Sequence, residues 1–213
     1  MCGIFAVLNN MSRFMKKEFI VDQFNKGKKR GPDDSNILDL YVMNCMLGFH
    51  RLAINGQSSS ADQPFHLKGC RLICNGEIYN FRKLITEYGL ENDYKSQSDC
   101  EIIIHLYKIY GIETTLQVLD GIYAFILIDN RITNSKDLDA KIYIARDPYG
   151  VKPLYILKPN TIHPNYSLIK SKLNNIYGFS SQEQVLNHLQ QDLIFSNQDI
   201  IYGNNYAKSF TDN

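Results

Sequence analysis

The sequence has almost no excess of either charge, no long hydrophobic run and no paired-cysteine motif. Its 23 Lys and Arg residues against 22 Asp and Glu residues leave a net charge of +1, so composition gives no reason to expect nucleic acid or an anionic membrane as a partner. No apolar run approaches the ~20 residues that a membrane-spanning helix needs. The apolar run near the N-terminus is too short for a signal peptide, and no basic residues precede it. We therefore expect a cytoplasmic protein that binds neither nucleic acid nor a membrane.

The cysteines lack the spacing of a disulfide framework or of a zinc site. An odd number of them without a signal peptide indicates reduced thiols. Cys70 and Cys74 share one face of an expected strand, but no Cys-x-x-Cys or His-x-x-x-His pair accompanies them. We expect no metal ion. The five cysteines are Cys2, Cys45, Cys70, Cys74 and Cys100.

The hydrophobic pattern predicts an α+β fold in one large domain. The 213 residues, 44% of them hydrophobic, are enough to bury a substantial core. Helical periodicity is clearest over residues 81–88, before Gly89, and again after Ser98-x-x-Glu101, which is typical of a capping box and predicts a helix that ends at Gly111. Weaker helices are predicted over 15–26 and from near residue 180. Short apolar runs predict strands at 4–8, 40–43, 46–52, 71–74, 122–128, 141–145 and 151–157, and "RGPDDS" has the composition of a loop.

The opening "MCGIFAVLNN" places Cys2 directly before the first predicted strand. If Met1 is removed, Cys2 carries both a thiol and a free α-amine. Their ordinary pKa values are about 8.5 and about 7.7–8.0, so proton transfer between them costs only about 1 kcal/mol. The amine can then be the general base for its own nucleophile. A small residue in front of an ordinary strand explains the same ten residues equally well.

Four further residues have the chemistry of an amide-hydrolysing site. Asn75 has a side-chain amide and Gly76 an unobstructed N–H at an expected strand end, and together they suit a developing oxyanion; an ordinary Asn-Gly turn is the alternative. Arg51 lies in an otherwise apolar strand and suits a carboxylate, or it forms an edge-strand salt bridge. Asp99 in a first helical turn suits an ammonium group, or it stabilises the helix dipole.

The motifs together resemble those of class II glutamine amidotransferase domains, most of all the glutaminase domain of asparagine synthetases. The resemblance runs from Met1 to about Tyr155, more faintly to about Leu189, and implies the four-layer αββα sandwich of N-terminal nucleophile hydrolases. We expect a domain over residues 2–190 and a C-terminal tail over 191–213. The motifs, in order, are "MCGIF", "RGPD", "GFHRLAI", "NGEIYN", "SDCEIIIHLY", "LDGIYAF" and "RDPYGVKPLY".

The resemblance also implies a role for each matching residue. Cys2 would attack the side-chain amide of L-glutamine, and Asn75 and Gly76 would form the oxyanion hole. Arg51 would bind the α-carboxylate, and Asp99, helped by Glu77, the α-ammonium group. Backbone groups of Leu52, Ala53, Ile54 and Asn55 would line the pocket. Asn55-Gly56 replaces the usual Val-Asp there, and Phe81 replaces a usual histidine.

Asparagine synthetases continue into an ATP-pyrophosphatase domain with a Ser-Gly-Gly-x-Asp-Ser loop, which this sequence lacks. We therefore expect the chain to release ammonia for an asparagine-synthetase-type amidation of aspartate without activating aspartate itself. ATP and magnesium would be needed only in a synthetase partner domain, so no cofactor is expected in this chain. Two other functions stay open: a catalytically degenerate regulatory or interaction module, and an N-terminal nucleophile hydrolase of another amide.

Overall fold

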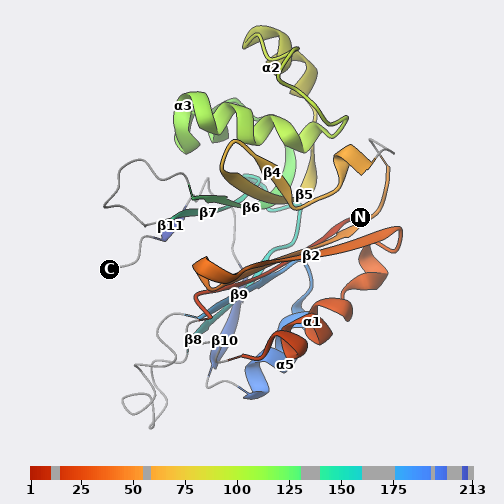
Figure 1. The fold of residues 1–213 in the computed structure, drawn as a ribbon, viewed down its shortest axis with the longest axis vertical. Helices are drawn as coiled ribbons and strands as arrows, with labels where there is room; N and C mark the ends of the chain where they lie inside the picture. Colours follow the sequence, from red (N-terminus) through yellow and green to blue (C-terminus); the bar gives the residue numbers. More distant parts are fainter. Residues whose placement is uncertain are drawn as a thin grey trace. The chain divides into compact units, whose positions relative to one another are not determined.

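The chain forms two compact units in a computed structural model. The structure describes residues 1–10, 15–54, 59–130, 140–159, 176–192, 195–200 and 208–210. One unit comprises Met1–Leu52 and Pro153–Ile201, and the other comprises Ala53–Lys152 and Tyr202–Asn213. Each unit has its own β-sheet and its own helices (Figure 1).

The first unit is built on a six-stranded antiparallel sheet in the order β10-β8-β9-β1-β3-β2. The first strand in the chain, β1, is buried along its whole length, between β3 and β9. Its pairing on both sides explains why the N-terminal segment is held in place. The strands are β1 (Gly3–Leu8), β2 (Asp34–Leu40), β3 (Cys45–Arg51), β8 (Tyr155–Pro159), β9 (Tyr177–Ser180) and β10 (Phe195–Ile200).

Helices α1 (Lys17–Asn25) and α5 (Glu183–Asp192) pack against one face of this sheet. Ile20 and Phe24 of α1 and Leu186 of α5 join the sheet residues Phe5 and Val7 in one hydrophobic cluster. Alternate residues of β1 therefore supply the surface on which both helices lie.

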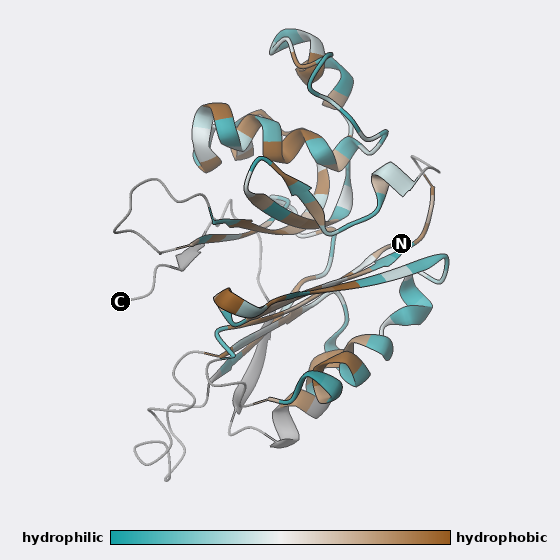
Figure 2. Cartoon of the chain, in the orientation of Figure 1, coloured by the Kyte–Doolittle hydropathy of each residue, from teal (hydrophilic) through white to brown (hydrophobic). Residues whose placement is uncertain are grey.

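The second unit is built on a five-stranded antiparallel sheet in the order β11-β7-β6-β5-β4. Helices α2 (Phe81–Glu87) and α3 (Ile102–Val118) cover one face, and Figure 2 shows the hydrophobic residues concentrated along α3 and the central strands. The strands are β4 (Phe65–Leu67), β5 (Cys70–Ile78), β6 (Gly121–Asp129), β7 (Lys141–Arg146) and β11 (Lys208–Phe210).

The α+β prediction is confirmed. Each unit pairs an antiparallel sheet with a helical layer, and two sheets and two helical layers are the components of an αββα sandwich. Within the described ranges, no helix is both long enough and apolar enough to cross a membrane.

Two predictions around residue 40 are wrong. Residues of the expected "RGPDDS" loop begin strand β2, and Tyr41–Met43 form a 3₁₀ turn instead of a strand. Strand β2 pairs only with β3, at the edge of its sheet, and most of its side chains are at least partly exposed. An edge strand tolerates polar residues, so its hydrophobic alternation is too weak to recognise in sequence.

Two other boundaries differ from prediction, and some strands were not predicted. Strand β5 continues through Asn75 and Gly76 to Ile78, so Gly76 is not at a strand end. Residues 151–154 precede strand β8 instead of belonging to it. Strands β4, β9, β10 and β11 were not predicted; β4, β9 and β11 have only three or four residues each.

The predicted capping box at Ser98 does not form. Ser98 makes no side-chain cap hydrogen bond; it precedes a 3₁₀ turn (Asp99–Glu101) that leads into α3. The Glu101 carboxylate instead accepts hydrogen bonds from the backbone N–H groups of Lys95 and Ser96, at 3.0 and 2.5 Å, and pairs with His105 at 3.0 Å. Other nearby groups, all within six residues of Glu101, therefore take the place of the capping contact.

Gly111 interrupts helix α3 without ending it. Its φ of 79° and ψ of 176° are not helical, yet the helix resumes and continues to Val118. Glycine has no Cβ to oppose a positive φ, so it allows the kink. The predicted end at Gly111 is in this respect wrong.

Candidate functional site

Cys2 lies at the end of the β1–β3 ladder. Gly3 pairs with His50, so Cys2 extends the ladder beside Arg51. The half-buried Cys2 Sγ is 3.4 Å from the Leu52 N–H, which donates to it, and 3.5 Å from the Leu52 carbonyl oxygen. The first unit therefore brings together Cys2, Arg51 and Leu52, three of the predicted site residues.

Arg30 is a site residue to which sequence reasoning assigned no role. Its Nε donates to the Cys2 carbonyl oxygen at 2.8 Å. Burial lowers the pKa of Arg30, and the neighbouring Cys2 opposes this shift. A cation beside a thiol favours the thiolate. The sequence does contain a signal for Arg30. It is the arginine of the "RGPD" motif, which contributed to the family resemblance but indicated no role for this side chain.

Gly31, also in "RGPD", lets this turn approach strand β3. A Cβ at Gly31 would lie 2.4 Å from the backbone carbonyl atoms of His50. No side chain fits at that distance, so the motif requires glycine for close backbone packing. The turn that carries Arg30 is thereby held against the end of β3.

His50 connects β3 to helix α1 and to strand β2 in the first unit. Its Nε2 donates to the Phe24 carbonyl oxygen at 2.8 Å, which leaves Nδ1 to accept from Ser35 Oγ at 2.7 Å. The imidazole also stacks on the Phe24 ring, with the centroids 3.9 Å apart. Burial lowers the pKa of His50, and the nearby Lys28 charge lowers it further.

We expect the stability of the protein to fall as pH decreases below the ordinary histidine pKa of 6.5. The unfolded chain binds a proton at position 50 in that range, whereas the folded chain, whose His50 pKa is lower, does not. The slope contributed by His50 is at most about 1.4 kcal/mol per pH unit. Urea unfolding between pH 7.5 and 5 would show this slope in the wild type and a flatter one in His50→Gln. The pKa of the exposed His66 is also lowered, by partial burial first and then by the Arg71 charge, so His66→Gln should flatten the slope too, but less than His50→Gln because His66 is exposed.

Arg51 ends strand β3, which lies between β1 and β2 in the interior of its sheet. The edge-strand alternative for Arg51 is therefore wrong. Only 8% of the Arg51 side chain is exposed, and its cross-strand neighbour in β2 is Asp34. A buried guanidinium at a strand end suits bidentate binding of a carboxylate.

In the second unit, Gly76 directs its backbone polar groups away from strand β6. Its partner in the register is Tyr123, whose N–H and C=O both bond Asp147, at 3.3 and 2.7 Å. Gly76 and Tyr123 are therefore a non-hydrogen-bonded pair, and the Gly76 N–H points to the outer edge of β5. The turn alternative for Asn75-Gly76 is wrong.

Two side chains bond the main chain along this outer edge. The Gln63 amide bonds Cys74, and Asp99 Oδ2 accepts from the Ile78 N–H at 2.6 Å. Gly76 lies midway between these two positions, with its carbonyl oxygen 3.9 Å from Cys100 Sγ. Gln63 is a second residue that sequence reasoning missed, and no local signal indicated it.

Asn75 is buried, with 2% of its surface exposed. Among the described residues, its Nδ2 has no hydrogen-bond partner. A buried donor without a partner costs about 1–3 kcal/mol. Such a group is therefore a candidate to receive a ligand oxygen.

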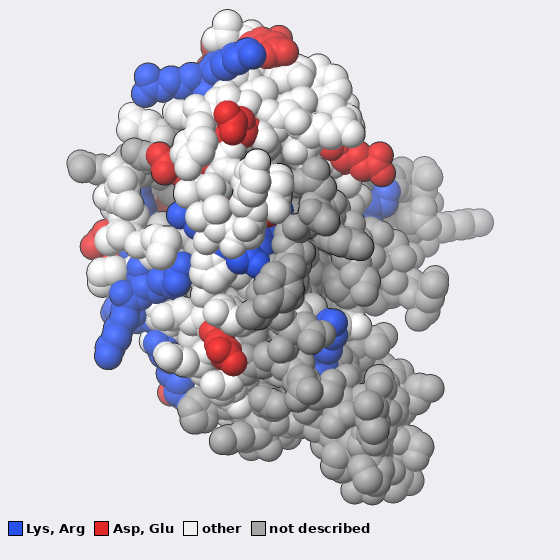
Figure 3. All heavy atoms as spheres, turned by 180° about the vertical axis from the view of Figure 1, so that it is seen from behind, with Lys and Arg blue, Asp and Glu red and all other residues white. Residues whose placement is uncertain are grey.

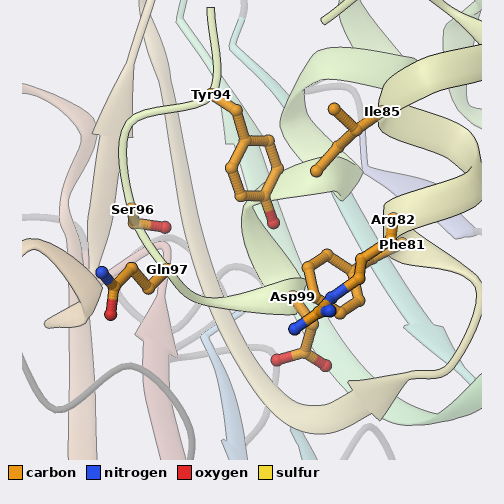
Figure 4. Close-up of a pocket in the computed structure, with 7 residues that line it drawn as sticks. All are labelled: Phe81, Arg82, Ile85, Tyr94, Ser96, Gln97 and Asp99. Atoms are coloured by element: carbon orange, nitrogen blue, oxygen red, sulfur yellow. The ribbon is translucent and has the colours of Figure 1, made fainter. Parts of the chain in front are cut away.

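Asp99 lines a pocket of about 430 Å³ in the second unit. In Figure 4, Tyr94, Ser96 and Gln97 come from the loop before Asp99, while helix α2 supplies the facing side chains, Phe81, Arg82 and Ile85. Burial raises the pKa of Asp99, and the Glu77 charge raises it further, while backbone hydrogen bonds, that of Ile78 first, oppose the shift. Glu77 itself is exposed.

The remaining predicted residues follow strand β3. Leu52 and Ala53 are partly buried, Ile54 is 71% exposed, and Asn55 lies outside the described residues. None of the five cysteines, all of them described, forms a disulfide, and in the described ranges no group of three or more His, Cys, Asp or Glu residues could hold a metal ion.

Comparison with known families matches residues 1–202 to the glutamine amidotransferase domain. This match covers almost the whole chain. The chain belongs to the glutamine amidotransferase domain family.

The relatives of this glutamine amidotransferase domain include glutamine-hydrolysing asparagine synthetases. The chain is 40% identical over 162 residues to that of Gallus gallus, and 39% identical over 159 residues to asparagine synthetase 2 of Arabidopsis thaliana. It is 35% identical over 158 residues to a probable asparagine synthetase of Acanthamoeba polyphaga mimivirus. Each match covers 73% of this chain but only 25–27% of the relative, so the chain spans about a quarter of the length of these relatives.

The surface of the glutamine amidotransferase domain agrees with its net charge of +1. On the face in Figure 3, basic and acidic side chains are interspersed among uncharged ones in the coloured parts. The few ion pairs between described surface residues, such as Lys17–Asp39 at 3.5 Å, join exposed or partly exposed side chains and contribute little stability.

Proposed function

We propose that the chain hydrolyses L-glutamine to glutamate and ammonia through a thioester on Cys2. The family membership supports glutamine as substrate. The single observation that carries the proposal is the buried Asn75 amide donor, which has no partner among the described residues and adjoins the outward-facing Gly76 N–H. Donors held in place before charge develops are what acyl transfer requires.

In the proposed mechanism, Cys2 supplies both the nucleophile and the base once Met1 is removed. Its α-amine takes the thiol proton, and the thiolate attacks the side-chain carbonyl carbon of glutamine. The negative charge that forms on the carbonyl oxygen is stabilised by Asn75 Nδ2 and the Gly76 N–H. The ammonium group returns the proton to the leaving nitrogen, ammonia departs, and water then hydrolyses the thioester to glutamate. The Arg30 cation beside Cys2 favours the thiolate.

Substrate recognition is proposed to use the charged ends of the amino acid. Arg51 binds the α-carboxylate, and Asp99 with Glu77 binds the α-ammonium group. Backbone groups of residues 52–55 line the pocket. The raised pKa of Asp99 fits a carboxylate that is stabilised when a cation arrives.

We expect Asn75→Ala to lower kcat by about 10²–10³ and to leave KM nearly unchanged. The Asn75 amide is aimed at charge that exists only in the transition state, so ground-state binding loses little. Steady-state glutaminase kinetics measure both constants. A raised KM with unchanged kcat would make Asn75 a binding residue and contradict its oxyanion role.

We further propose that the ammonia serves an asparagine-synthetase-type amidation of aspartate. The relatives named above support this, and ATP and magnesium would be bound only by a synthetase domain or subunit. In this chain the reaction needs no cofactor.

Glutamate release from glutamine by the purified chain tests the proposal, with and without an added synthetase domain. Glutamate and ammonia in equal amounts are the expected products of the chain alone, with no asparagine from aspartate and ATP. Absence of glutamate under both conditions would contradict the proposal and favour a regulatory or interaction role. Asparagine made by the chain alone would contradict the need for a synthetase partner.

A further inference from the structure

Gln63 bonds both main-chain polar groups of one residue in strand β5. Its Oε1 accepts from the Cys74 N–H at 2.6 Å, and its Nε2 donates to the Cys74 carbonyl oxygen at 3.1 Å. Gln63 is 4% exposed and Cys74 is 1% exposed. Both hydrogen bonds are therefore shielded from water, and losing either one leaves a buried polar group without a partner.

The pairing of strands β4 and β5 explains why a side chain is needed at this point. The ladder runs from Leu67 with Cys70 to Phe65 with Leu72, and its continuation would place Gln63 opposite Cys74. Strand β4 begins only at Phe65, so the main chain of Gln63 does not continue the ladder. The Gln63 amide has one donor and one acceptor, as a peptide group does, and so takes the place of the missing strand partner.

The Gln63–Cys74 pair adjoins the proposed oxyanion donors. Asn75 follows Cys74 directly, and Gly76 lies two residues away, about 7 Å along the strand. Cys74 and Gly76 direct their polar groups to the same edge of β5 because they are two residues apart. Two residues beyond Gly76, the Ile78 N–H donates a hydrogen bond to Asp99 Oδ2.

We propose that Gln63 is a positioning residue for the oxyanion hole, an inference that rests on the proposed glutaminase function. By completing the hydrogen bonding of Cys74, it fixes the backbone that carries the Asn75 amide and the Gly76 N–H. Gln63 itself touches neither the substrate nor the reacting atoms. Loss of this restraint displaces the donors, and a displacement of about 1 Å at a catalytic group can cost about 10²-fold in rate.

Gln63→Met tests the inference, because methionine has nearly the same length and no hydrogen-bonding amide. We expect kcat to fall about 10–100-fold, with KM within about threefold of wild type. In an Asn75→Ala background the same change should lower kcat less than threefold, since one of the donors is already gone. Gln23→Met is the matched control: Gln23 is also buried, but its amide bonds Asp22 and Lys26 on helix α1. Loss of kcat in both glutamine variants would indicate general destabilisation and overturn the inference.

Amide hydrogen exchange, resolved by residue with NMR, tests Gln63 independently of activity. The Cys74 amide should be protected in the wild type and should exchange at least about tenfold faster in Gln63→Met. Gln63→Glu keeps the acceptor for the Cys74 N–H and should retain that protection, which provides a second variant if methionine prevents folding. Rapid exchange of Cys74 in the wild type, or a wild-type kcat in Gln63→Met, would overturn the inference. An inactive wild type with the expected exchange pattern would instead refute the glutaminase function and leave the Gln63–Cys74 pairing supported.

Discussion

Cys2→Ala is expected to release no measurable glutamate from glutamine. Alanine keeps the α-amine and removes the thiol, so no thioester can form. Cys2→Ser should be nearly as inactive, because a hydroxyl that is not activated is a much weaker nucleophile than a thiol. Cys45→Ala is the control in the same unit: Cys45 is buried in β3 and its Sγ donates to the Met43 carbonyl oxygen at 3.0 Å. It should keep the wild-type kcat.

The proposed mechanism also requires that the α-amine of Cys2 is free. A preparation that retains Met1, or carries an uncleaved tag, should keep the thiol and the fold yet lose activity, because the base is then an amide nitrogen. Mass spectrometry identifies the terminus of each preparation, and the same samples are assayed for glutaminase. Full activity in a preparation that wholly retains Met1 would contradict the mechanism and require a side-chain base.

Arg51→Ala and Asp99→Ala are each expected to lower kcat/KM by roughly 10²–10³ or more. Each removes one partner of a desolvated charge pair with the substrate, which costs about 3–5 kcal/mol, and every 1.36 kcal/mol is about a tenfold change in rate. Arg51→Lys keeps the charge but not the bidentate fork, so most of the loss should remain. Steady-state kinetics with glutamine measure each effect.

Asp99 needs a further control because its Oδ2 also accepts from the Ile78 N–H. Asp99→Asn keeps an acceptor for that N–H and removes the charge, so it separates substrate binding from the positioning of β5. Asp129→Asn is the matched control, because Asp129 is also buried, at 7% exposed, and accepts a hydrogen bond from the Tyr107 hydroxyl at 2.6 Å. It should keep the wild-type kcat/KM for glutamine. A loss below fivefold in Asp99→Asn or Arg51→Ala would remove that residue from the substrate site.

The local sequence pattern was sufficient to predict helices and strands that are long and amphipathic or that consist of a continuous apolar run. The predicted runs correspond to β1, β3, β6 and β7 within one or two residues, and the periodicity of residues 81–88 corresponds to α2. It failed at edge strand β2, whose residues are half exposed, and at Ser98, where Glu101 bonds Lys95, Ser96 and His105 instead of capping. In both cases the structure depends on a group outside the local pattern: strand β3 for β2, and the partners of Glu101 for the expected capping box.

The sequence by itself determined the family and the identity of the residues proposed to act, because the motifs that carry them are contiguous and ordered along the chain. The tertiary structure alone decided the direction of the Gly76 N–H, since this depends on which groups of Tyr123 are already bonded to Asp147. It alone placed Arg30 on the Cys2 carbonyl and Gln63 on Cys74, across 28 and 11 residues of sequence. A hydrogen bond requires a distance and an angle between two atoms, and neither can be derived from residue types until the chain has brought the atoms together.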